Sequence, residues 1–184
     1  MPDWTTWVLT VLQMVGNRVM KILSNRIKKD VENRLLIMAG GSNISRSDVS
    51  KLLMVFDLLI VSKTHVSVDV IGVDCLVNQN GVLLQHGYWK SPMLESSIGY
   101  STNPVHMKGR EDATFSVAMN LVHLGYIPRE LSHFSVSGVL DIECGAGVVH
   151  KVFDVGLFSV EEDSHVLYSE LQRIREEMQS NATS

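Results

Sequence analysis

Apolar residues follow steps of three and four through the first thirty positions of the chain, and polar residues occupy the opposite side. The apolar set is Trp4, Trp7, Val8, Val11, Val15, Val19, Ile22, Leu23 and Ile27. The polar set includes Thr10, Gln13, Asn17, Lys21, Asn25 and Lys28. A stripe with this period is typical of an amphipathic helix. We therefore predict an N-terminal helical segment over residues 1–38.

Two further segments carry apolar residues at helical spacing. Residues 39–47 contain two adjacent glycines, interrupt the first pattern and predict a loop. Residues 48–61 are apolar around most of a helical circumference, which predicts a buried core helix. Residues 112–124 predict another helix, and Gly125 is the residue that should end it.

Alternation with a period of two predicts two β-hairpins. In the first, residues 66–77 and 82–88 flank a turn that ends in Asn-Gly. In the second, residues 134–143 and 148–160 flank a Gly-Ala-Gly turn. The stretch between the hairpins shows neither period at residues 90–110, so we expect a long exposed loop there.

A last helical pattern begins at Ser164 and runs to about Met178. The order of elements predicts an α+β fold, in which an antiparallel sheet made from two β-hairpins is covered by helices on one face. In a chain of 184 residues we expect three parts: the basic amphipathic helix at 1–38, one α+β domain at 39–179 and a disordered tail at 180–184.

Charge is distributed unevenly along the chain. The formal net charge is −4, yet residues 1–60 balance to +3 and residues 141–184 to −6. Six cations gather in the second half of the predicted N-terminal helix: Arg18, Lys21, Arg26, Lys28, Lys29 and Arg34. This division favours an anionic partner at one end or head-to-tail self-association, with ordinary surface charge as the simpler alternative.

Two tryptophans followed by a basic cluster are typical of a helix that lies in a membrane interface. Trp4 and Trp7 would sit at the headgroup level while the six cations meet anionic lipid. The apolar run before Asn17 is too short to span a bilayer, and the cations follow it, whereas in a secretory signal they precede it. The alternatives for this helix are packing on the domain's own core and docking in a partner's groove.

The sequence contains no catalytic or metal-binding motif. Its seven His residues are scattered over different predicted elements, without the spacing of metal ligands. Cys144 near His150, and the pair Asp141 and Glu143 on one face of a strand, come closest to catalytic pairs, but structural roles are favoured for all four. We therefore assign no catalytic residue, no metal and no cofactor.

The second hairpin resembles the C-terminal sheet segment of rhabdovirus matrix proteins. The similar stretches are HFSVSGVLDI at 133–142 and FDVGLF at 153–158, and the chain length, the basic front and the richness in methionine agree with it. The resemblance implies a structural protein that self-associates and links the viral nucleocapsid to the anionic inner leaflet, in the virion and host cytoplasm, peripheral to the membrane and not secreted. It leaves direct RNA contact open. It also makes Tyr168 and Leu171, which form a YxxL pattern, a late-domain-like candidate.

Two other function classes stay open. One is a cytosolic adaptor or host-modulating accessory protein that docks its N-terminal helix in a partner's groove. The other is a small enzyme built around residues 90–110, for which the Cys144 thiol would be the reactive group.

Overall fold

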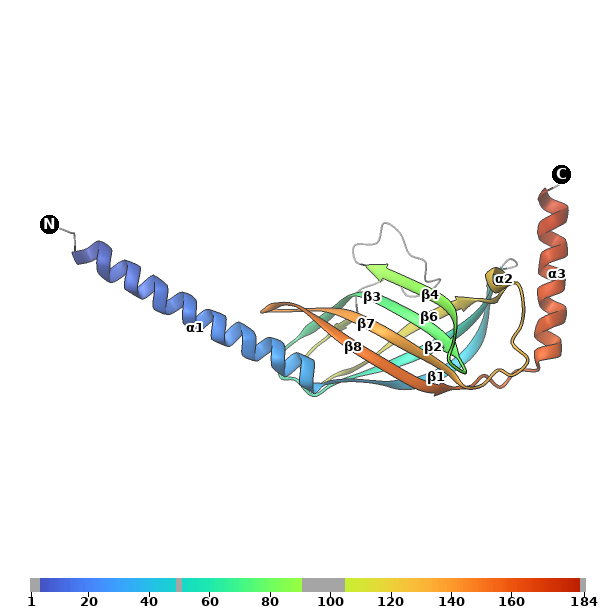
Figure 1. Ribbon diagram of the computed structural model, residues 1–184, viewed down its shortest axis with the longest axis horizontal. Helices are drawn as coiled ribbons and strands as arrows, with labels where there is room; N and C mark the ends of the chain where they lie inside the picture. Colours follow the sequence, from blue (N-terminus) through green and yellow to red (C-terminus); the bar gives the residue numbers. More distant parts are fainter. Residues whose placement is uncertain (1–3, 49–50, 91–104, 183–184) are drawn as a thin grey trace.

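The computed structural model describes residues 4–48, 51–90 and 105–182, with side chains at 12–46, 52–88 and 105–181. Two β-sheets are stacked, with a long helix projecting from one end and a shorter helix at the other end (Figure 1). The elements are α1 (Trp4–Arg34), β1 (Leu35–Asp48), β2 (Lys51–Ser62), β3 (Val68–Gln79), β4 (Val82–Lys90), β5 (Val105–Met107), β6 (Asp112–Asn120), α2 (Leu121–Leu124), β7 (Phe134–Cys144), β8 (Gly147–Phe158) and α3 (Ser164–Ala182).

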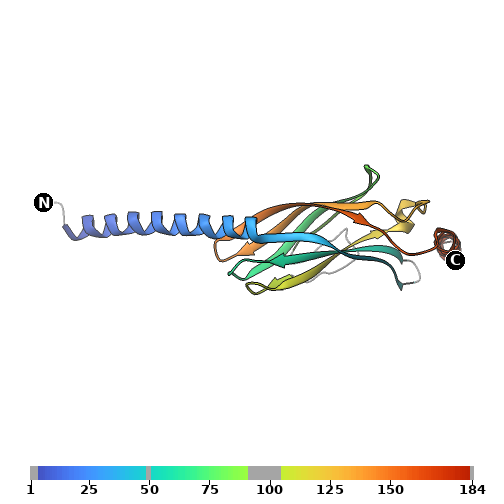
Figure 2. The ribbon, with the colours of Figure 1, turned by 90° about the horizontal axis from the view of Figure 1, so that it is seen from below.

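All strand pairs are antiparallel. One sheet has the order β1-β2-β6, and the other has the order β4-β3-β7-β8 with β5 also paired to β3. Figure 2 shows the two sheets as separate layers. The α+β class and both predicted hairpins, β3–β4 and β7–β8, are therefore confirmed. In the first hairpin Asn80 and Gly81 adopt φ values of 49° and 80°, as a tight turn between twisted strands requires.

The core lies between the two sheets. Phe56 of β2 stands 5.5 Å from Phe134 of β7 and 5.3 Å from Phe158 of β8, measured between ring centroids. All three side chains are buried. The three-stranded sheet therefore covers the sheet that contains the two hairpins, whereas the sequence predicts that helices cover it.

The helix predicted at residues 48–61 is wrong, because this segment forms β2. Its inward side chains, Leu52 and Met54 among them, are fully buried, and on the opposite face Leu53 and Val55 are only 2% and 5% exposed. A middle strand covered on both faces has a continuous apolar sequence, which periodicity alone does not distinguish from a buried helix.

The loop predicted at residues 39–47 is also wrong, because β1 continues to Asp48. The two glycines mark a β-bulge, where the register with β2 shifts between Ala39 and Ser42. A Cβ at Gly40 would lie 3.0 Å from the Asp57 carbonyl oxygen. Glycine therefore permits the close approach of β1 to β2 at the bulge.

The helix predicted at residues 112–124 is wrong over most of its length. Residues 112–120 form β6, whose inward residues Phe115, Val117 and Met119 alternate along the strand. Only Leu121–Leu124 is helical. Gly125, at φ 78°, ends this short helix and donates its N–H to the Leu121 carbonyl, so the predicted stop was confirmed.

The boundaries of three other predictions also shift. The N-terminal helix ends at Arg34, and residues 35–38 begin β1. The C-terminal helix continues to Ala182, so residues 180–182 of the expected tail are helical. Within the loop expected at 90–110, residues 91–104 lie outside the described residues, and Val105–Met107 forms β5.

Candidate functional site

The helix α1 projects from the end of the β-sandwich along the long axis of the molecule (Figures 1 and 2). Its 31 residues correspond to a length of about 46 Å at 1.5 Å per residue. Its last three turns contact the sheets, where Val31 is fully buried and Ile27 packs at the edge of the core. The first two thirds of the helix therefore extend beyond the sandwich.

Two hydrogen bonds fix the end of α1 on the β7–β8 hairpin. The Ser24 hydroxyl donates to the Ala146 carbonyl at 3.2 Å, and the Lys151 ammonium donates to the Glu32 carbonyl at 2.6 Å. Ala146 lies in the turn between the two strands and Lys151 on β8. The hairpin that carries the family resemblance is thus the element that holds the helix.

Apolar side chains cover the projecting part of α1 and remain in contact with water. Between residues 12 and 23, seven of them are 47–66% exposed: Leu12, Met14, Val15, Val19, Met20, Ile22 and Leu23. The expectation that this helix packs on the domain's own core therefore holds only for its C-terminal third. A run of exposed aliphatic residues of this length is typical of a surface that binds a partner or a membrane.

The six cations predicted to bind an anionic partner all lie on α1. Lys28 is half-buried and the other five are exposed. Arg34 pairs through its Nε with Asp30 at 3.0 Å. Trp4 and Trp7 lie in the first turns of the helix, and their side chains are outside the described residues. Arg18 and Lys21 therefore lie within the exposed apolar part of the helix, and the other four cations follow it.

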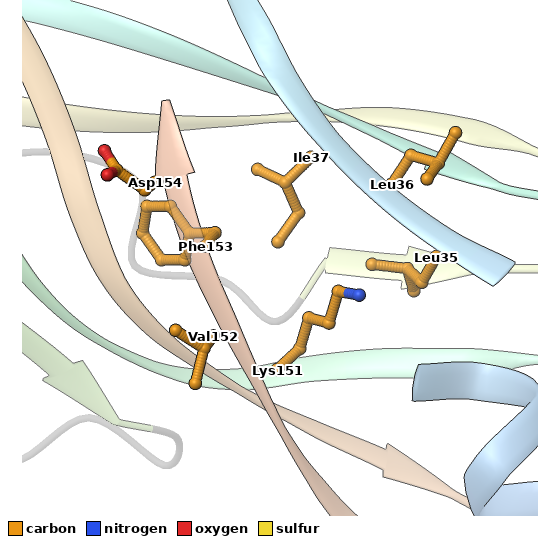
Figure 3. Close-up of a pocket in the computed structure, with 7 residues that line it drawn as sticks. All are labelled: Leu35, Leu36, Ile37, Lys151, Val152, Phe153 and Asp154. Carbon is orange, nitrogen blue, oxygen red and sulfur yellow. The ribbon is translucent and has the colours of Figure 1, made fainter. Parts of the chain in front are cut away.

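Two open cavities border this region. One, of about 460 Å³, lies beneath α1 and is lined by Met20, Lys21, Leu23, Ser24, Ile27, Gly145 and Ala146. The other, of about 240 Å³, lies between β1 and β8 (Figure 3). Its two charged groups, on Lys151 and Asp154, point away from each other (Figure 3). Neither cavity gathers the convergent polar groups that a catalytic site requires.

Cys144 and His150, considered as a catalytic pair, are each bonded to another partner. The Cys144 thiol donates to the Gly147 carbonyl at 3.1 Å, while His150 Nδ1 is hydrogen bonded to Asp141 at 2.7 Å. The other cysteine, Cys75, is buried, and burial raises the pKa of its thiol to about 12. Within the described part of the chain, no three His, Cys, Asp or Glu side chains are grouped to hold a metal ion.

Three histidine–aspartate pairs that the sequence did not predict lie on the outer face of the five-stranded sheet. His106 is hydrogen bonded to Asp69 at 2.6 Å and His86 to Asp74 at 2.5 Å, in addition to the His150 pair. Each pair joins neighbouring strands. The register of the hairpins could have revealed two of these pairs, because cross-strand neighbours on one face are in contact.

The YxxL pattern lies on α3 with only one of its two residues accessible. Tyr168 is 52% exposed, whereas Leu171 is fully buried in the core. A partner that reads both side chains cannot reach Leu171 while α3 is folded in place. The structure therefore does not present this pattern as a binding motif.

One contact between the basic front and the acidic end does form, within the chain itself. Arg46 of β1 binds Glu170 of α3 through Nε at 3.0 Å and Glu162 through its terminal nitrogens at 3.3 and 3.4 Å. The hydrogen bonds that Arg46 donates to the carboxylates of Glu162 and then Glu170 raise the pKa of Arg46 above its ordinary value. This ion-pair network anchors the start of α3 to the three-stranded sheet.

Within residues 4–48, 51–90 and 105–182, no helix combines the length and the apolar content that a membrane crossing needs.

No family model and no curated protein matches the chain. Among solved structures, a target of the Northeast Structural Genomics Consortium is 8% identical, with a TM-score of 0.42, over 69% of this chain and 84% of that one. A protein from Archaeoglobus fulgidus is 23% identical, with a TM-score of 0.39, over 70% of this chain and 96% of that one. Both TM-scores are below 0.5, so these similarities do not indicate a function for the chain.

Proposed function

We propose that the chain is a non-enzymatic, matrix-like viral structural protein whose helix α1 holds the β-sandwich against the anionic inner leaflet of a membrane. The observation that carries this proposal is the exposure of the aliphatic side chains at residues 12–23 on a helix that projects beyond the sandwich. A helix with one apolar side and a basic cluster binds in the interface plane, with its apolar side about 5–10 Å deep.

The basic cluster supplies the second half of the interaction. Each Lys or Arg near an anionic leaflet contributes about 1 kcal/mol of attraction, which salt screens. Acidic residues dominate elsewhere: residues 141–184 balance to −6. An anionic surface therefore attracts α1 and repels that end of the chain, which favours binding through the helix.

Self-association and nucleocapsid binding come from the resemblance at residues 133–158. Neither of the two solved structures described above is a named matrix protein. Membrane binding is consequently the part of the proposal that the geometry of α1 supports directly, and it is the part to test first.

The test is co-sedimentation of the full chain with vesicles of phosphatidylserine and phosphatidylcholine, or of phosphatidylcholine alone, across a salt series. We expect salt-sensitive pelleting with the anionic vesicles only. The double variant Val15→Asp with Val19→Asp should abolish it, because both side chains are about half exposed on α1 and a charge there opposes insertion.

A matched control places the same substitutions elsewhere. Val82 and Val166 are 61% and 55% exposed on β4 and α3, so Val82→Asp with Val166→Asp should pellet like the unmodified chain. Removal of residues 1–35 is a poorer test, because it takes the fully buried Val31 and Leu35 out of the core. Absence of pelleting by the unmodified chain contradicts the proposal.

A second candidate is an adaptor whose helix docks in a groove of another protein. The spacing of Leu12, Val15, Val19 and Ile22, in alternating steps of three and four, fits such a groove. This alternative predicts no binding to either vesicle and a protein complex that persists at high salt.

A further inference from the structure

The cations of α1 do not all face the same side. Residues three and four positions apart share one side of a helix. Alternating steps of this kind connect six residues, which we call the outer seam: Leu12, Val15, Val19, Ile22, Arg26 and Lys29. Along this seam the first four residues are aliphatic and the last two are basic.

The same steps connect Lys21, Ser24, Lys28 and Val31 on the opposite side, which we call the docked side. Val31 is fully buried, and the Ser24 hydroxyl is bonded to the β7–β8 turn. A Cβ at Gly147 would lie 3.4 Å from Lys28 Nζ, which shows how closely this ammonium approaches the hairpin.

Lys21 also lines the cavity between α1 and the hairpin turn. The two lysines of the docked side therefore face the sandwich.

Along the outer seam, no such contact with another described residue is found. Its four aliphatic side chains are 49–63% exposed. Arg26 and Lys29 are also exposed, and neither makes an ion pair with another described residue. The side of α1 that can approach a flat surface therefore carries four aliphatic residues, followed by two cations that have no ion-pair partner among the described residues.

We propose that anionic phospholipid headgroups bind at Arg26 and Lys29 and that the sandwich sits on the far side of the helix from the leaflet. This inference rests on the proposed function and states which cations serve it. With the aliphatic part of the outer seam inserted, Arg26 lies about 6 Å along the helix from Ile22. That distance places its guanidinium at the phosphates that border the inserted segment.

Lys21 and Lys28 are held away from the leaflet by the helix itself. A helix with its side chains is about 10 Å across, which exceeds the Debye length of about 8 Å at physiological salt. Their attraction to the leaflet is therefore largely screened, although their charge equals that of the outer pair.

The test compares two charge-matched variants of the full chain, Arg26→Glu with Lys29→Glu and Lys21→Glu with Lys28→Glu. Both change the net charge equally and lie in the same stretch of helix. We expect the first pair to weaken binding to phosphatidylserine-containing vesicles by about tenfold or more, and the second pair to change it less than about twofold. Circular dichroism and thermal unfolding establish that both variants are folded.

The outcomes separate this inference from the proposed function. Equal weakening by the two pairs overturns the inference, because it means that only the total charge of α1 matters. Stronger weakening by the Lys21 and Lys28 pair reverses the proposed orientation. If the unmodified chain does not bind anionic vesicles at all, the proposed function itself fails.

Discussion

The two terminal helices have similar amphipathic sequences but opposite environments. In α3 the apolar face is buried, with Leu167 and Leu171 fully covered and Ile174 only 3% exposed. In α1 the apolar side chains described between residues 12 and 23 remain about half exposed. α3 contacts α2 and is tied to β1 by Arg46, whereas α1 extends past the end of both sheets.

This difference shows that a hydrophobic period identifies the apolar face of a helix but does not identify the surface against which that face packs. Burial of one leucine side chain is worth about 2 kcal/mol, and that gain is available only where another layer lies within reach. The sandwich offers such a layer to α3 and to the last turns of α1. The described side chains of α1 between residues 12 and 23 have no such layer within the described part of the chain.

The largest expected difference in stability is between substitution of one leucine in α3 and substitution of one leucine in α1. Leu171→Ala in α3 should lower the free energy of unfolding by about 2–5 kcal/mol, because a fully buried side chain leaves a cavity. Leu12→Ala, at a position that is 63% exposed, should change it by less than about 0.5 kcal/mol. Urea titration of both variants measures the two values. A comparable loss at Leu12 would mean that α1 is already packed in solution.

A second pair of variants sharpens the comparison within α1 itself. Val31→Ala, at a fully buried position, should cost about 2 kcal/mol of stability. Val19→Ala, three turns earlier and 49% exposed, should cost less than about 0.5 kcal/mol. Thermal unfolding of the two proteins, read by the loss of sheet signal, gives the difference. Equal midpoints would show that the end of α1 is not part of the core.

The smallest expected effect concerns the ion pairs that hold α3. Arg46→Ala removes hydrogen bonds to Glu162 and Glu170, but Arg46 is 40% exposed, so the cost should be about 0.5–1 kcal/mol. Arg34→Ala, which removes an exposed pair within α1, is the control at about 0.3 kcal/mol. Amide hydrogen exchange should show faster exchange in α3 for the first variant only. Unchanged exchange there would mean that apolar contacts alone hold the helix.

The predictions from the sequence hold where local chemistry decides the structure. The Asn80-Gly81 turn, the alternation from Phe134 and the glycine stop at Gly125 were all confirmed. They are wrong at β2 and β6, where neighbouring strands determine whether a segment is helix or strand. Apolar residues on both faces of β2 fit a buried helix as well as a strand, and pairing with β1 and β6 is what selects the strand.

The candidate site divides in the same way. The sequence identified α1, its apolar stripe and all six of its cations, because a helix is periodic and its side chains lie where the period puts them. It treated Lys28 and Lys29 as equivalent, although they are adjacent on the chain and point to different sides of the molecule. It also missed Arg46, whose partners Glu162 and Glu170 are more than a hundred positions away.

The sequence by itself therefore determined the two terminal helices, the two hairpins and the separation of a basic front from an acidic end. Only the tertiary structure decided that the two middle segments predicted as helices form the strands β2 and β6, and that a second sheet covers the hairpins. It also decided which side of α1 is exposed. The physical reason is the distance along the chain between the residues that interact. Turns, caps and periodic faces depend on residues a few positions apart, whereas strand pairing and burial depend on segments that meet only when the chain is folded.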